Sequence, residues 1–156
     1  YQTGVKLVRG AYMEKERERA LEFGYHSPIQ PDKISSDRGF DAAVAWVLDH
    51  LDQIHLVAGS HNEASNMKLC EDMKARNLKA NNPKIWFAQL LGMSDPITFN
   101  LSAMGYNVAK YVPYGPIREA IPYLIRRAQE NTSVAGQTSR ELELLKQEQM
   151  RRRGTS

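Results

Sequence analysis

Four short apolar runs recur along the chain, and residues with the spacing of an amphipathic helix follow each of them. The runs predict strands at 5–8, 54–58, 85–91 and 108–112, and a glycine or proline lies just beyond each one. Strands that alternate with helices in this way are typical of a parallel sheet joined by crossover helices. Because the runs lack polar alternation, we expect an α/β fold whose sheet is covered on both faces. Spacing alone does not separate a doubly wound sheet from a (β/α)8 barrel, of which four units would be about half.

Caps and chain breakers set the expected ends of the helices. The sequence predicts helices at 13–23, 40–51, 63–77, 95–104 and 139–152. We expect Ser36 or Asp37 to cap the second helix and Met67 to lie on the buried side of the third. Because proline lacks a backbone N–H, we expect a break or kink at Pro122 and a new helix starting there. These boundaries predict a main domain at 1–135, followed by a polar helix and tail at 136–156.

Composition excludes several classes of protein. The chain has 156 residues, 42% of them hydrophobic, and a net charge of +3. Much of the basic excess lies at 146–153, so no basic face that would bind nucleic acid recurs along the earlier helices. The single cysteine, Cys70, cannot form an intrachain disulfide and fits a small core residue. No apolar run approaches the ~20 residues of a membrane span, and no signal peptide is visible, so we do not expect a secreted protein.

The first residues suggest how this chain arises. It begins at Tyr1 without an initiating methionine and enters a predicted strand almost at once. We therefore expect a fragment or a processed product of a longer protein.

A polar stripe lies along the predicted helix that starts at Pro122. Tyr123, Arg126, Arg127 and Glu130 fall at i, i+3, i+4 and i+7, so they share one helix face. Two neighbouring guanidiniums repel each other unless an anion lies between them, and a carboxylate can accept paired hydrogen bonds from one of them. The stripe therefore fits a carboxylate-binding site. It also fits a solvated face on which Glu130 pairs with an arginine for about 0.2–0.5 kcal/mol.

Other polar residues stand at the predicted strand ends, where barrel enzymes place their chemistry. Lys6 and Arg9 end the first strand, and Ser60, His61 and Asn62 follow the second. No second His or Cys stands at ligand spacing near His61, so we expect no metal. An inward-facing lysine needs an anion or a polar neighbour, unless its stem carries the charge out to water.

Several of these motifs together resemble the proline dehydrogenase family, whose members use FAD to oxidise L-proline. The resemblance rests on segments in the family's order, which are VKLVRGAY at 5–12, AGSHN at 58–62, FAQLLGM at 87–93, YVPYGP at 111–116 and the signature helix at 123–131. It covers the chain from near its first residue to about residue 134. It implies a (β/α)8 barrel, with this chain supplying strands five to eight, their helices and a C-terminal helix. The family's first four strands, with a Lys, an Asp and a Gln of its active site, would lie outside the chain.

The resemblance also implies roles for individual residues. The catalytic residue is Lys6, where family members place Arg or Lys against the N5–O4 edge of the flavin. The substrate-binding residues are Arg126 and Arg127, which clamp the proline carboxylate, with Tyr123, Tyr111, Leu90 and Tyr12 around the ring. The cofactor-binding residues are Lys6, Arg9, Gly10, Ala11, Ser60, His61, Asn62, Arg127 and Glu130. The family usually has Thr at the position of Ser60, and relatives that prefer hydroxyproline tend to carry a small residue at that of Tyr111.

The implied reaction moves a hydride from proline to flavin N5, gives 1-pyrroline-5-carboxylate and passes the electrons to a membrane quinone. This is a step of proline catabolism toward glutamate. The resemblance is compatible with peripheral membrane contact, with a homo-oligomer, and with either the bacterial cytoplasm and inner membrane or the mitochondrial matrix and inner membrane. Three alternatives stay open: a hydroxyproline-preferring dehydrogenase, an inactive half-barrel, and a phosphate-binding α/β protein. The last is weakest because no glycine-rich phosphate loop follows a strand.

Overall fold

Two units make up the chain, Tyr1–Lys110 and Tyr111–Ser156. The computed structural model of the protein describes residues 2–133 and 137–153. The first unit contains the helices α1 (Met13–Phe23), α2 (Lys33–Leu48), α3 (Glu63–Ala75) and α4 (Asp95–Ala103). The second contains α5 (Ile117–Ser133) and α6 (Gln137–Arg153).

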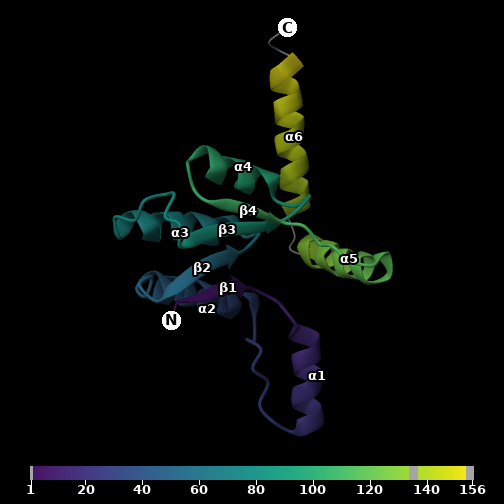
Figure 1. Cartoon of the computed structure of the whole chain (residues 1–156). Coiled ribbons are helices and arrows are strands. Elements are labelled where there is room, and N and C mark those ends of the chain that lie inside the picture. Colours follow the sequence, from purple (N-terminus) through teal and green to yellow (C-terminus); the bar gives the residue numbers. More distant parts are fainter. Residues whose placement is uncertain (1, 134–136, 154–156) are drawn as a thin grey trace. The chain divides into compact units, whose positions relative to one another are not determined.

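A four-stranded sheet forms the centre of the first unit (Figure 1). Its strands are β1 (Thr3–Val8), β2 (Ile54–Gly59), β3 (Ile85–Leu90) and β4 (Val108–Tyr111), side by side in chain order. The pairs β1–β2 and β2–β3 are parallel, and Val8 lies opposite Gly59. The strand–helix alternation therefore predicted the α/β class and each strand to within a residue or two.

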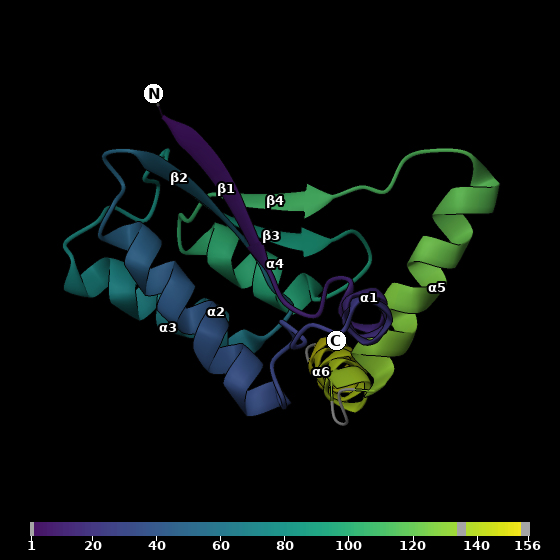
Figure 2. The ribbon, with the colours of Figure 1, turned by 90° about the horizontal axis from the view of Figure 1, so that it is seen from below.

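One face of the sheet is buried under helices. Figure 2 shows α2, α3 and α4 on the same side of the strands. The core between them combines strand residues with helix residues, which include Leu56, Ile85, Phe87, Phe40, Val44, Val47, Leu69, Met73 and Leu101. Alternation places Val8 and Trp86 on the other face, where they are 46% and 40% exposed. The expectation that the sheet is covered on both faces is wrong for this unit.

Helix α2 begins earlier than the sequence predicts. It starts at Lys33 and not at Phe40, and its N-cap is Asp32, whose carboxylate accepts a 2.6 Å hydrogen bond from the Ser35 N–H. The predicted caps Ser36 and Asp37 lie inside the helix. The physical reason is that the Asp37 carboxylate pairs with Arg9 and Lys33, so it does not accept hydrogen bonds from backbone N–H groups as a cap would.

The buried face of α3 also differs from its prediction. Met67 is 57% exposed, whereas Leu69, Cys70 and Met73 are buried. The buried stripe includes Ser65 and Asn66, two residues and one residue before Met67, and continues at Leu69, Cys70 and Met73, so Met67 lies on the solvent side. Burial raises the pKa of the Cys70 thiol, which agrees with its prediction as a core residue.

The predicted break at Pro122 is absent. Helix α5 runs from Ile117 to Ser133 with Pro122 inside it. Pro122 has no N–H to donate to the Arg118 carbonyl. Because Arg118 is exposed, water can donate to that carbonyl instead. Helix α6 begins at Gln137, while the predicted domain boundary at 135/136 lies outside the described residues.

None of the helices among the described residues is both long enough and apolar enough to cross a membrane.

The two faces of α3 give a direct test of the core. Replacing Leu69, which is 2% exposed, by Ala should lower the free energy of unfolding by about 2–5 kcal/mol, because it leaves a cavity. The matched control is Met67→Ala on the exposed face of the same helix, with an expected change within about 0.5 kcal/mol. Urea denaturation followed by circular dichroism measures both. Equal losses would contradict the assigned faces.

Candidate functional site

The carboxyl ends of β1, β2 and β3 meet at one edge of the sheet, since these strands are parallel. The predicted residues Arg9, Ser60, His61 and Leu90 lie at or just beyond these ends. Helices α2 and α3 bring further polar side chains to the same place. Residues distant in the chain therefore form one cluster at this edge.

The centre of this cluster is the guanidinium of Arg9. It donates to Asp37 Oδ1 of α2 at 2.5 Å, to Ser60 Oγ at 2.6 Å and to Ser65 Oγ of α3 at 3.1 Å. It also stands 4.6 Å above the centre of the Phe40 ring. The Arg9 side chain is only 16% exposed, so its charge is balanced mainly by protein groups.

Two further carboxylate contacts extend the cluster. Ser65 Oγ donates to Asp41 Oδ1 at 2.8 Å, and Lys33 Nζ lies 2.5 Å from Asp37 Oδ2. Arg9, Ser65 and Asp41 thus form a hydrogen-bonded chain from the end of β1 through α3 to α2. The sequence reasoning missed Asp37, Asp41 and Ser65. The available signal was a pair of carboxylates four residues apart on one helix face.

The turn after β2 is held by its own side chains. Ser60 Oγ accepts a 3.1 Å hydrogen bond from the Asn62 N–H, and Asn62 Oδ1 caps α3 by accepting from the Ser65 N–H at 3.0 Å. Asn66 Nδ2 donates to the carbonyls of Ser60 and Asn62. The predicted cofactor residue Asn62 therefore has a structural task, since its amide oxygen starts the helix.

His61 lies between the ends of β2 and β3. Its Nδ1 is 2.9 Å from Ser94 Oγ, and the Leu90 N–H points to its Nε2 at a long 3.5 Å. If Nε2 accepts this bond, the proton is on Nδ1, an assignment that rests on the hydrogen-bond network. Burial lowers the pKa of His61, and the nearby charge of Lys110 lowers it further. The imidazole is therefore held neutral, which fits hydrogen bonding better than proton transfer.

Lys6 belongs to the opposite face of the sheet from Arg9, because strand residues alternate. It is exposed, whereas Leu7 packs on the core. The side chains of Val8 and Lys6 pack closely against the backbone of Gly59. A Cβ at Gly59 would lie 2.8 Å from Val8 Cγ1 and 3.4 Å from Lys6 Cε. The two predicted cationic cofactor residues thus present their charges on different faces.

The exit from β1 is tightly turned. Gly10 has φ +69° with open space around its Cα, and Tyr12 has φ 58° and precedes α1 with its ring exposed. Gly10 and Ala11 therefore leave backbone accessible beside the Arg9 cluster. Such a place allows a ligand to approach the main chain closely.

The second unit holds the aromatic and arginine residues of the signature helix. The rings of Tyr111 and Tyr123 meet edge to face with their centres 6.4 Å apart. The Arg127 guanidinium lies 5.3 Å from the centre of the Tyr123 ring, and Arg126 is exposed. Glu130 lies in the same helix α5. The structure thus brings together Tyr111, Tyr123 and Arg127 as predicted neighbours.

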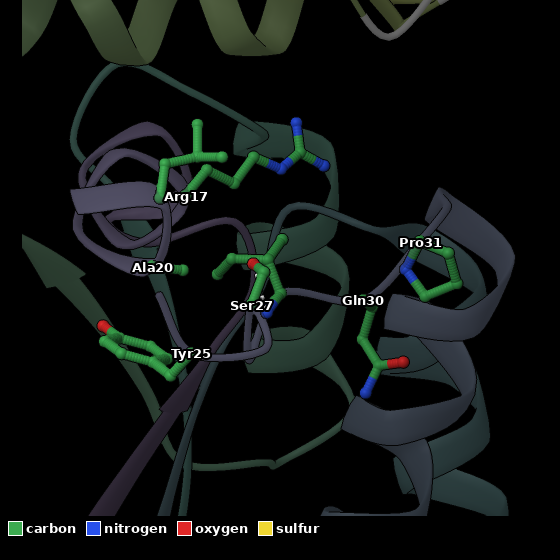
Figure 3. Close-up of a pocket in the computed structure, with 8 residues that line it drawn as sticks. Arg17, Ala20, Tyr25, Ser27, Gln30 and Pro31 are labelled. Atoms are coloured by element: carbon green, nitrogen blue, oxygen red, sulfur yellow. Dashed lines mark hydrogen bonds between the residues drawn. The ribbon is translucent and has the colours of Figure 1, made fainter. Parts of the chain in front are cut away.

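A separate cavity of about 400 Å³ lies between α1 and the loop that follows it (Figure 3). Arg17, Tyr25, Ser27 and Gln30 contribute its polar lining. None of the predicted site residues lines it. The geometry therefore favours the strand ends over this cavity as the candidate site.

Comparison with known proteins identifies relatives along nearly the whole chain. A family model described as proline dehydrogenase matches residues 1–140. The chain is 43% identical over 152 residues to proline dehydrogenase 1, mitochondrial, of Homo sapiens, and 44% identical over 153 residues to hydroxyproline dehydrogenase of Bos taurus. Both alignments cover 96% of this chain, but 25% and 33% of the respective relatives. The chain thus spans a quarter to a third of their length.

Solved structures share the fold. Proline utilization A (PutA) from Bdellovibrio bacteriovorus, inactivated by N-propargylglycine, matches with a TM-score of 0.76 at 30% identity, over 85% of this chain and 14% of that one. A PutA mutant from Bradyrhizobium japonicum matches with a TM-score of 0.71 at 25% identity, over 86% and 14%. The family predicted from the motifs is confirmed.

The environment of His61 predicts how stability depends on pH. The unfolded chain binds the His61 proton near pH 6.5, while the folded chain binds it only at lower pH. The unfolded state thus gains protons first on acidification, so stability present above pH 6.5 is lost as the pH falls toward the lowered pKa. We expect His61→Asn to reduce the fall in melting temperature between about pH 7.5 and about pH 5.5. The control is His26→Asn, in the exposed loop after α1, and an equal reduction there would contradict this account.

Proposed function

Because the chain belongs to the proline dehydrogenase family, we propose that it supplies half of the (β/α)8 barrel of an FAD-dependent enzyme that oxidises L-proline. The open face of the four-stranded sheet supports this proposal. In a closed barrel that face, with Val8 and Trp86, would be covered by further strands.

The residues at the strand ends fit a flavin dinucleotide. The donor set suits an anionic, hydrogen-bond-accepting group, with Lys6 exposed on the open face, a neutral His61, and the accessible backbone at Gly10 and Ala11. In this unit the residues that would hold the cofactor are Lys6, Arg9, Gly10, Ala11, Ser60, His61 and Asn62. When bound, flavin would supply the acceptor for a hydride from proline C5, and with loss of a proton from the amine the product would be 1-pyrroline-5-carboxylate.

The single observation that carries the substrate assignment is the Tyr111–Tyr123–Arg127 cluster. Arg127 lies over the Tyr123 ring, which packs against Tyr111, so a guanidinium and two apolar ring faces are adjacent. This combination suits a small cyclic amino acid, because its carboxylate pairs with arginine while its ring contacts tyrosine. Within this unit Arg126 and Arg127 would hold the carboxylate, with the two tyrosine rings beside the ring of the substrate.

Within the enzyme each side chain has a physical task. The arginines would fix the orientation of the substrate, which is the main contribution of such residues to a hydride transfer. The Lys6 ammonium would stabilise negative charge that develops at the flavin edge. Electrons would then pass to a membrane quinone, with peripheral contact to a bacterial inner membrane or a mitochondrial inner membrane and with room for a homo-oligomer. The reaction would serve proline catabolism.

The arginine pair provides the first test. In the complete enzyme that contains this chain, Arg126→Ala or Arg127→Ala should weaken proline binding by about 1.5–3 kcal/mol, because each removes hydrogen bonds to a charged group. That is roughly 10- to 150-fold in Kd. The matched control is Arg118→Ala, an exposed arginine in the first turn of the same helix, which should leave Kd unchanged. Titration of proline against flavin reduction measures the three variants, and an unchanged Kd in both site variants would remove the carboxylate clamp.

A second candidate substrate is hydroxyproline. The chain is about as similar to the bovine hydroxyproline dehydrogenase as to the human proline dehydrogenase. The large ring of Tyr111, packed on Tyr123, favours proline, because it leaves less room for an added hydroxyl beside the ring.

Comparison of the two substrates separates these candidates. We expect a higher kcat/KM for L-proline than for trans-4-hydroxy-L-proline, and Tyr111→Ser should narrow the difference by removing the bulky ring. A single missing or added group in such a pocket changes kcat/KM by roughly 10- to 200-fold. A native preference for hydroxyproline would instead select the second candidate.

A further inference from the structure

The hydrogen bonds around Arg9 have fixed directions. A guanidinium carries five N–H donors and no acceptor, so every bond that Arg9 makes must be accepted by its partner. Arg9 is therefore the donor in its hydrogen bonds with Asp37, Ser60 and Ser65. Ser65 has its oxygen occupied by Arg9, and its own proton goes to Asp41. The direction of the network is set from one end to the other.

Ser60 stands at the other end of this network. Its hydroxyl oxygen accepts from Arg9 at 2.6 Å and from the Asn62 N–H at 3.1 Å, which fills both acceptor positions. Its proton must then be donated, and among the residues that the structure describes none accepts it. Ser60 is only 6% exposed, so an unmade hydrogen bond there would cost free energy.

We propose that Asp37 is a positioning residue: through Arg9 it holds Ser60 as a hydrogen-bond donor to an acceptor atom of the flavin cofactor. This inference rests on the proposed function, because it needs a flavin at the strand ends. Ser65, which itself donates to Asp41, accepts from the same Arg9 nitrogen as Asp37, whereas Ser60 accepts from the other one. Arg9 then acts on the cofactor through Ser60 and not as a ligand of its phosphates.

The surroundings of Arg9 favour this role over direct phosphate binding. Its side chain is largely buried and is already engaged by a carboxylate of α2. A cation that is paired in this way offers little net attraction to another anion. The accessible backbone at Gly10 is better placed for a negatively charged group.

The two roles predict opposite effects of one substitution. In the complete enzyme, Asp37→Asn removes the charge that holds Arg9. If Asp37 positions Ser60 through Arg9, FAD binding should weaken by roughly tenfold, the loss expected for one hydrogen bond. If Arg9 binds the phosphates, release from Asp37 should tighten FAD binding, and this would overturn the proposal. Fluorescence titration of the apoenzyme with FAD gives the Kd, a measurement that does not depend on turnover.

A double-mutant cycle distinguishes positioning from general stability. Ser60→Ala should weaken FAD binding as Asp37→Asn does, and Ser60→Thr, which keeps the hydroxyl, should restore it. The double variant Asp37→Asn with Ser60→Ala should bind no worse than Ser60→Ala alone, because Asp37 acts only through Ser60. Additive losses would overturn the proposal, since a merely structural carboxylate would act independently of Ser60.

The matched control lies at the other end of the same helix. Asp49, the C-cap of α2, accepts from Arg76 at 2.8 Å, so Asp49→Asn removes a comparable ion pair away from the strand ends. Its FAD affinity should equal that of the native enzyme. Melting of the apo variants checks their folding, and Asp37→Ser is a second neutral variant if Asp37→Asn does not fold.

FAD binding by the native enzyme shows whether the proposed function or only the positioning role has failed. If it binds no FAD, the proposed function fails and this inference falls with it. If it binds FAD and Ser60→Ala binds equally well, the proposed function stands and only the positioning role is overturned.

Discussion

The hydrogen bonds of Arg9 hold together the edge of the sheet on which the candidate site depends. One guanidinium joins the end of β1 to the turn after β2 and to the helices α2 and α3. Its partners lie 28, 51 and 56 residues away in the chain, so they meet only in the folded state. Because a buried guanidinium is costly without acceptors, the fold must supply all of them together. The geometry of the strand ends follows from satisfying this one group.

The alternation of strand residues then divides the chemistry between two faces. Leu7 and Arg9 point to the helices, whereas Lys6 and Val8 point to the open face. Helix packing thus buries one cation and leaves the other exposed on the open face.

The second unit carries its own local order. Tyr123 contacts Tyr111 on one side and Arg127 on the other, so these side chains are arranged by α5 and the residues before it. The stripe at i and i+4 makes this possible, because Tyr123 and Arg127 are one helical turn apart.

The sequence by itself determined the α/β class, the strands to within a residue or two, and the shared helix face of Tyr123 and Arg127. These features depend on local periodicity, which is written into neighbouring residues. Tertiary structure alone decided that Asp37 pairs with Arg9 and does not cap α2, that Met67 faces solvent, that α5 continues through Pro122, and that Ser60 accepts from Arg9. Each of these depends on partners or on water that no local pattern encodes. The physical reason is that the cost of burying a polar or charged group is offset only when distant segments bring it a partner.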